Sequence, residues 1–153
     1  MPVNKKSIII DSTFITTPNL PTSRYNGKYK KKGTKLSALI TKDKKVVDFK
    51  LSPGNVHDAK VFPEFKRIIK TIKPKYFYGD KAYDSKSISS FLKSIKCDDR
   101  ISKRRSKKVY KTRIYIENFF TSLNQFREIE RSFVRSVDNF IFYLEVALVL
   151  LYF

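Results

Sequence analysis

The sequence is poor in cysteine, glycine and proline, and each shortage narrows the classes of protein it can belong to. Cys97 is the only cysteine among 153 residues, so an intramolecular disulfide is impossible and a cysteine-based zinc site is excluded. We therefore expect a reducing, cytoplasmic environment. With only four glycines and six prolines, and with 14% aromatic residues, the chain is expected to fold rather than stay disordered.

Long apolar runs are also missing. Only three isoleucines precede Asp11, which is too few for the apolar part of a signal peptide. The run at residues 140–153 is shorter than a membrane span and contains Glu145. We expect no membrane segment and interpret the C-terminal run as a buried closing helix.

Acidic residues are scarce relative to basic ones: 14 Asp and Glu stand against 33 Lys and Arg, which gives a formal charge of +19. A surface of this charge binds a polyanion through counterion release, and the affinity depends on salt rather than on sequence. DNA or RNA fits this pattern better than a small acidic substrate. An anionic membrane surface, or charge that only maintains solubility, is the alternative.

Hydrophobic residues make up 41% of the chain, enough to build one packed core, and we expect a single domain over residues 1–153. Strand-like patterns occupy 6–15, 35–41, 46–51, 76–79 and 98–102, and helical patterns occupy 57–72, 84–95, 109–127 and 134–151. Proline and glycine mark the stretch between the first two strands as a long loop. This order predicts an α/β fold with a mixed five-stranded sheet, in which three antiparallel strands precede the α/β units and helices cover both faces.

Asp11 interrupts an apolar strand, with Ile10 before it and Phe14 shortly after it. An ionised carboxylate inside a buried strand is costly unless it is paired or binds a metal, so a ligand role explains it. A strand that ends at Asp11 in an Asx turn is the alternative.

Asp80 directly follows the aromatic strand pattern at residues 76–79. This places a carboxylate at the C-terminal end of a strand, where open sheets bind ligands. A Gly-Asp turn that leaves the strand is the alternative. Asp84 fits a helix cap better than a ligand.

The segment at residues 110–124 places polar side chains on one helix face. At about 100° per residue, Tyr110, Arg113, Glu117 and Asn124 fall within a stripe about 60° wide. An adjoining apolar sector can be buried, which leaves a carboxylate and a guanidinium at its edge. An ordinary ion pair between Arg113 and Glu117 is the alternative.

This spacing, Tyr-x2-Arg-x3-Glu-x6, resembles the signature of insertion-sequence DDE transposases of the insertion sequence four and five groups. Residues 11–13 and 79–84 look like that family's two aspartate motifs, and residues 55–58 look like its Asn-x-His-Asp stretch. The likeness runs from about residue 8 to the C-terminus. The family usually has Lys where this chain has Asn124, so one DNA contact loses its charge.

The resemblance implies an RNase H-like catalytic domain that cleaves and joins DNA at transposon ends, with Asp11, Asp80 and Glu117 as catalytic metal ligands. Two Mg2+ or Mn2+ ions in such a site activate the attacking oxygen and stabilise the leaving one. Neighbouring carboxylates repel one another by roughly 4 kcal/mol per pair at about 4 Å, so we expect a loose or partly protonated site without metal. His57 and Lys81 are accessory candidates, although His57 can equally begin a helix.

Several residues are candidates for binding DNA. Tyr110 and Arg113 are candidates for holding a phosphate beside the metals, with Asn124 further along the same stripe. Two basic stretches flank the site in sequence, and we expect both to follow the DNA backbone. Their candidate residues are Lys30, Lys31, Lys32, Arg104, Arg105, Lys107 and Lys108. Solvated loop charge is the alternative.

The interval between Asp80 and Glu117 has room for only a helix, a strand and a loop, which indicates a minimal catalytic core. The chain begins just before its first catalytic strand, so we expect the N-terminal DNA-binding domain to be absent, with a subunit from another reading frame as a candidate partner. We also expect a homo-oligomer in the active complex. Two alternatives stay open: a decayed transposase that only binds DNA, and an RNase H-like nuclease that acts on RNA–DNA hybrids or junctions.

Overall fold

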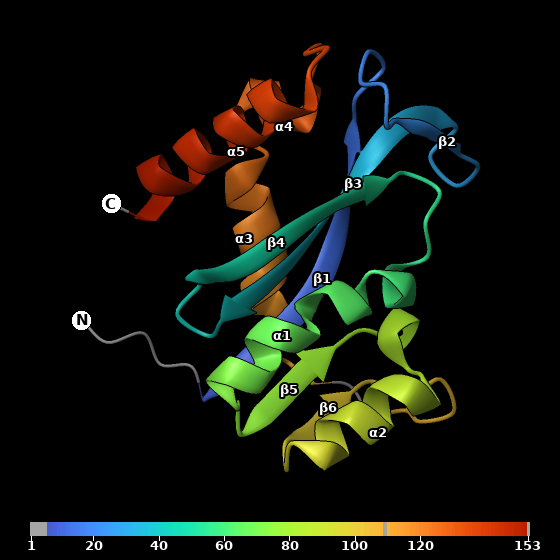
Figure 1. Ribbon diagram of the computed structural model, residues 1–153, viewed down its shortest axis with the longest axis vertical. Coiled ribbons are helices and arrows are strands. Elements are labelled where there is room, and N and C mark those ends of the chain that lie inside the picture. Colours follow the sequence, from blue (N-terminus) through green and yellow to red (C-terminus); the bar gives the residue numbers. More distant parts are fainter. Residues whose placement is uncertain (1–5, 109, 153) are drawn as a thin grey trace.

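The centre of the protein is a six-stranded mixed β-sheet, seen in the computed structural model in Figure 1. The structure describes residues 6–108 and 110–152. Neighbouring strands follow the order β2-β3-β1-β5-β6, and β4 also pairs with β3. The strands are β1 (Ser7–Thr16), β2 (Arg24–Asn26), β3 (Lys31–Thr41), β4 (Val46–Pro53), β5 (Tyr76–Gly79) and β6 (Asp98–Ile101).

The mixed topology is as predicted, but the number of strands is not. β3 runs antiparallel to both β1 and β4, whereas β5 and β6 continue the sheet in parallel. The sixth strand is β2, which lies in the stretch predicted as a loop and pairs with the first residues of β3. A strand of three residues is too short to show periodicity, so the surrounding prolines and Gly27 concealed it.

Helices cover both faces of the sheet, as predicted (Figure 1). One face carries α1 (Phe62–Ile72) and α2 (Lys86–Ser94), and the other carries α3 (Arg113–Leu123), α4 (Arg127–Glu130) and α5 (Val137–Tyr152). Two 3-10 turns, η1 (Asp58–Lys60) and η2 (Lys81–Tyr83), precede α1 and α2.

β1 separates two hydrophobic cores. Successive side chains of a strand point to opposite faces, so Ile8 and Ile10 pack with α1 and α2, whereas Ile9 and Ile15 pack with α3 and α5. All four are at most 1% exposed, and burying each contributes roughly 1.5–3 kcal/mol relative to exposure. Asp11 has the same parity as Ile9, so the alternation directs its carboxylate to the α3 face.

The predicted helix boundaries shift where turns intervene. The pattern at 57–72 is η1 followed by α1. α1 ends at Ile72, and its C-cap Lys73 has a φ of 48° and is followed by Pro74. The helix predicted at 109–127 begins only at Arg113, and its expected first residue, Val109, lies outside the described residues.

α5 has large apolar residues on both of its sides. Its inner residues Phe140, Leu144 and Ala147 are at most 2% exposed. The outer side exposes Phe142, Tyr143, Val146, Val149 and Leu150, together with the polar residues Asp138, Asn139 and Glu145. The predicted closing helix is therefore buried on one side only. Across residues 6–108 and 110–152, no helix has both the length and the apolar character needed to cross a membrane.

Candidate active site

Asp11 and Asp80 stand beside each other on neighbouring parallel strands. The register of β1 and β5 matches Ile10 with Gly79, so the two aspartates follow at the same level. β1 continues through Asp11 to Thr16, and the alternative of a strand that ends at Asp11 is therefore wrong. Asp80 leaves β5 and caps η2, where its Oδ1 accepts a hydrogen bond of 2.6 Å from the backbone N–H of Lys81.

α3 brings Arg113 and Glu117 to the two aspartates. Arg113 Nη2 lies 3.7 Å from Asp11 Oδ2 and 3.5 Å from Glu117 Oε1. Arg113 Nη1 lies 3.4 Å from Asp80 Oδ1. The ion pair within α3 is thus one part of a larger cluster, in which carboxylates from three separate elements surround one guanidinium.

The three carboxylates differ in burial. The exposed fraction of the side chain is 15% for Asp11, 34% for Asp80 and 58% for Glu117. Burial raises the pKa of Asp11 from 3.8 to about 6, against the opposing effects of a 2.8 Å hydrogen bond from Ser12 N and the charge of Arg113. Asp11 is therefore partly protonated near pH 6.

A cleft of about 270 Å³ opens beside the aspartates. Its lining is mostly polar and contains carboxylates, lysines and two aromatic rings. The lining residues are Asp11, Ser12, Phe14, Asn26, Lys28, Tyr29, Lys35, Asp58, Asp80 and Arg113. Glu117 is outside this lining and joins the site through Arg113.

Asp58 and Lys35 belong to the cleft but were not among the predicted site residues. Asp58 Oδ1 accepts hydrogen bonds from Lys35 Nζ at 2.6 Å and from Ser12 Oγ at 2.8 Å. A signal was present, since Asp58 ends the Asn-x-His-Asp stretch and Lys35 ends the first basic stretch. His57, the accessory candidate, instead caps η1 by accepting a hydrogen bond from Ala59 N, and it does not line the cleft.

The donor atoms of the cluster suit a hard divalent cation, because Asp11, Asp80 and Glu117 offer carboxylate oxygens. Among the residues that the structure describes, no three His, Cys, Asp or Glu side chains are grouped closely enough to hold one ion. The guanidinium of Arg113 stands among the carboxylates, and its buried Nε has no hydrogen-bond partner within the described residues. The chemistry of these donor atoms fits a divalent metal, and in this structure the guanidinium of Arg113 lies among them.

Tyr110 and Asn124 lie at the two ends of the predicted stripe, and neither lines the cleft. Tyr110 precedes α3, and its ring packs edge-on against Tyr78 with centroids 5.7 Å apart. The prediction that Tyr110 shares a helix with Arg113 is therefore wrong, because the helix starts three residues later. Asn124 is the exposed C-cap of α3, and the side chain of Lys81 is also exposed.

The predicted basic residues are all exposed. Lys30 has a φ of 52° in the turn between β2 and β3, and Lys31 and Lys32 begin β3. The second group lies between β6 and α3 and consists of Arg104, Arg105, Lys107 and Lys108. The first group leads directly into the cleft through Lys28 and Lys35.

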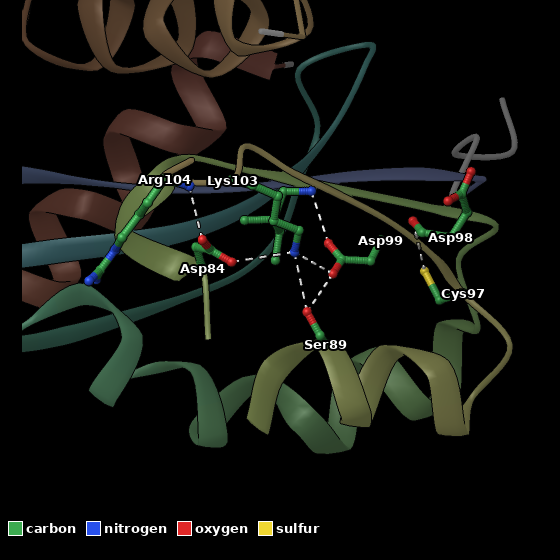
Figure 2. A network of polar contacts seen from close by, with 8 residues as sticks. Asp84, Ser89, Cys97, Asp98, Asp99, Lys103 and Arg104 are labelled. Atoms are coloured by element: carbon green, nitrogen blue, oxygen red, sulfur yellow. Dashed lines mark hydrogen bonds and ion pairs between the residues drawn. The ribbon is translucent and has the colours of Figure 1, made fainter. Parts of the chain in front are cut away.

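Figure 2 shows how the second basic group is attached to the fold. Lys103 Nζ lies 2.8 Å from Asp99 Oδ2 and 3.5 Å from Asp84 Oδ1, and it donates to Ser89 Oγ at 3.2 Å. The backbone N–H of Arg104 donates to Asp84 Oδ2 at 2.9 Å. Lys103 thereby ties the start of the basic segment to β6 and α2.

This network corrects the prediction for Asp84. The N-cap of α2 is Ser85, which makes no side-chain capping bond, whereas Asp84 binds the segment after β6. Burial alone would raise the pKa of Asp99, but hydrogen bonds from Lys103, Ser89 and Ile101 N outweigh burial and lower it. The predicted cap failed because the partners of Asp84 lie about 20 residues away, beyond the reach of a local pattern.

Two solved structures resemble this fold at low sequence identity. One is a chain of the simian T-cell lymphotropic virus intasome in complex with PP2A regulatory subunit B56 gamma, with a TM-score of 0.59, 13% identity, and coverage of 95% of this chain and 48% of that chain. The other is the catalytic core domain of BIV integrase, with a TM-score of 0.53, 11% identity, and coverage of 95% and 82%. The RNase H-like α/β fold is therefore confirmed. The chain spans about half the length of the first of these chains.

Sequence comparison identifies the family. The comparison with curated proteins found no match. The family described as the transposase DDE domain matches residues 4–152, which include Asp11, Asp80 and Glu117. The match covers nearly the whole chain and both aspartate motifs as well as the α3 signature. The protein belongs to the transposase DDE domain family.

Proposed function

We propose that this chain is the catalytic domain of an insertion-sequence transposase, which cleaves DNA and transfers strands with Asp11, Asp80 and Glu117 as ligands of two divalent metal ions. The observation that carries the proposal is the meeting of these carboxylates around Arg113 from β1, the end of β5 and α3. The signature spacing supports an element of the insertion sequence four or five groups. Residues 1–153 form a single catalytic domain in this proposal.

The charge of the cluster supports a cation site. Three carboxylates share one guanidinium, so their charges are only partly neutralised. Burial is the main cause of the raised pKa of Asp11, and the negative charges of Asp80 and Asp58 raise it further. Divalent cations relieve this repulsion more fully than one arginine can.

The residues of the cleft can divide the work of phosphoryl transfer. When bound, Mg2+ or Mn2+ would activate the attacking water or 3′-hydroxyl and stabilise the leaving oxygen. Arg113, released from the carboxylates, can bind a phosphate through two parallel hydrogen bonds. Lys35 also lines the cleft, where its ammonium group, 2.6 Å from Asp58 Oδ1, can bind a second phosphate.

The exposed basic residues support DNA as the substrate. Lys30, Lys31 and Lys32 follow Lys28 and Tyr29, which line the cleft, and the segment at 104–108 is held in place through Asp84. With a net charge of +19, the chain would bind the DNA backbone in a salt-sensitive way. In this proposal the partners are transposon ends, target DNA, further copies of the chain and a subunit from another reading frame. The chain acts inside the cell, on DNA.

A cleavage assay tests the proposed reaction. The chain is incubated with supercoiled plasmid carrying the element's ends, in buffer with Mg2+, Mn2+ or EDTA. We expect nicking with either metal, none in EDTA, and none for Asp80→Asn with either metal. Nicking of wild type that persists in EDTA, or equal nicking by Asp80→Asn, would contradict the assignment. A preference for RNA–DNA hybrids over transposon ends would support the nuclease alternative.

A second candidate is a remnant that binds DNA without cutting it. Asn124 favours it, since an uncharged residue occupies the place where the family usually has lysine. The same assay separates the two candidates. A remnant would bind the plasmid with strong salt dependence and leave it intact in every metal, even when a full-length transposase of the same element is added.

A further inference from the structure

Two aromatic rings form a stacked pair in the cleft, beside the catalytic carboxylates. Tyr29 lies in the turn between β2 and β3, and its ring stacks on that of Phe14 with centroids 4.5 Å apart and an angle of 10° between the planes. Tyr29 remains 44% exposed, and both residues line the cleft together with Asp11 and Asp80. A large flat apolar surface is therefore presented where the DNA would pass.

The ring of Phe14, on which Tyr29 stacks, is held in place by two glycines. A Cβ atom on Gly33 would collide with the ring of Phe14, and one on Gly54 would lie 2.8 Å from its Cε2 atom. Any larger residue at either position would push the ring away. The ring of Phe14 thus packs directly against the backbone of β3 and of the loop after β4.

The turn that carries the ring of Tyr29 is held in place by Asn26. The side-chain NH2 of Asn26 donates to Gly54 O at 2.7 Å, and its Oδ1 accepts from Lys28 N at 2.9 Å and from Tyr29 N at 3.4 Å. The turn that carries Tyr29 is therefore tied to the same loop that supports Phe14. The stack is pre-organised, which reduces the entropy lost on binding.

Positive charge surrounds the stack. Lys28 Nζ lies 5.4 Å from the centre of the Tyr29 ring, and Lys30, Lys31 and Lys32 follow in the exposed turn and at the start of β3. A flat aromatic face beside lysines is the arrangement with which proteins bind single-stranded nucleic acid, since bases stack on the ring and phosphates bind the cations.

We propose that Tyr29, supported by Phe14, is a stacking site for an unpaired DNA base at the entrance of the catalytic cleft. The stack recognises a base through its π face, so the site accepts any of the four bases and selects for strand separation. Lys28 leaves the ring when the base stacks and turns to the adjoining phosphate. The inference rests on the proposed function for its substrate, and it adds a preference for frayed or flipped DNA near the reacting phosphate.

A binding assay in EDTA tests this site without cleavage. One fluorescent duplex is prepared blunt and with a short unpaired extension, and the ratio of the two dissociation constants is measured by anisotropy. We expect wild type to prefer the extended DNA, and Tyr29→Ala to reduce that preference about fivefold or more, as loss of one stacked base requires. Tyr29→Phe should keep the preference.

Two controls separate stacking from packing. Tyr29→Leu keeps an apolar contact with Phe14 but removes the aromatic face, so it should behave as Tyr29→Ala does. Tyr25→Ala removes another exposed tyrosine, on β2, and should leave the ratio unchanged. An unchanged ratio in Tyr29→Ala and Tyr29→Leu would overturn the inference.

Failure of this inference is distinct from failure of the proposed function. If wild type nicks plasmid in Mg2+ and the ratio is unaffected by Tyr29, the stacking site is wrong and the transposase assignment stands. If the ratio depends on Tyr29 but no metal supports nicking, the stacking site stands and the catalytic assignment is wrong.

Discussion

Nη1 of Arg113 lies 3.4 Å from Oδ1 of Asp80, and the same guanidinium reaches Asp11 and Glu117 through Nη2. One arginine thus holds together carboxylates from three elements of the fold. In the metal-free protein it stabilises the site, whereas in the proposed active state it has to give its place to metal ions and bind phosphate instead. Its two roles lead to opposite effects of substitution with and without metal.

Arg113→Gln should destabilise the metal-free protein by about 1–3 kcal/mol, between the values for exposed and buried ion pairs, because the three carboxylates then repel one another. Urea unfolding in EDTA measures this loss. Added Mn2+ should stabilise the variant more than wild type. Arg100→Gln is the matched control, since Arg100 pairs with Asp98 outside the cluster. An equal Mn2+ response in both variants would contradict the competition between Arg113 and metal.

Asp11→Asn should stabilise the metal-free protein at pH 7.5. The pKa of Asp11 is raised by burial to about 6, above its ordinary value of 3.8, so wild type loses stability as pH rises from about 4 through about 6. At about 1.4 kcal/mol per pKa unit, the change in unfolding free energy caused by Asp11→Asn should be about 3 kcal/mol more favourable at pH 7.5 than at pH 3.5. Unfolding free energies of both proteins across this range provide the test. A difference that does not change with pH would be evidence against the raised pKa.

Asp99→Asn should have the opposite dependence on pH. The folded pKa of Asp99 is lowered, so its contribution is present above the unfolded pKa of about 3.8 and is lost as pH falls toward the folded value. We expect a loss of about 1–2 kcal/mol at pH 7, with faster amide exchange in residues 103–108, because Lys103 loses its partner. Asp98→Asn, a substitution of the exposed neighbouring residue, should cause neither this loss of stability nor the faster amide exchange.

DNA binding should depend on the second basic group and not on charge in general. One variant replaces Arg104, Arg105, Lys107 and Lys108 with Gln, and its control replaces Lys70, Lys73, Lys93 and Lys96, which lie on α1, α2 and their C-terminal ends. Each variant loses four positive charges. The first should lower the slope of log affinity against log salt by up to about 3.5, and the control should change it by less than about 1. Equal slopes in the two variants would indicate that DNA binding depends on net charge and not on the second basic group.

Much of the fold follows from local patterns in the sequence. The isoleucines around Asp11 identify β1, and the aromatic run before Asp80 identifies β5, because each strand is long or apolar enough to show its period. β2 could not be found, since its three residues are defined only by pairing with β3. The outer side of α5 was also missed, because an apolar composition does not tell which face a neighbour covers.

The candidate site was predictable in its carboxylates and less so in its surroundings. The order of the motifs predicts Asp11, Asp80 and Glu117 as the ligands, and the parallel register explains why the first two lie side by side. Asp84 and Tyr110 were assigned by local rules, a helix cap and a helix stripe, that long-range contacts override. The stack of Tyr29 on Phe14 could not be foreseen, because it joins two strands through a turn whose geometry depends on Asn26.

The most direct test of the central claim is anomalous X-ray diffraction from crystals of the chain bound to DNA and soaked in Mn2+. The account predicts Mn2+ peaks within bonding distance of carboxylate oxygens of Asp11, Asp80 and Glu117, with Arg113 turned away from Asp80 toward a phosphate. Full soaking with no peak among these carboxylates, and with the pair of Arg113 and Asp80 intact in the presence of DNA, would contradict it.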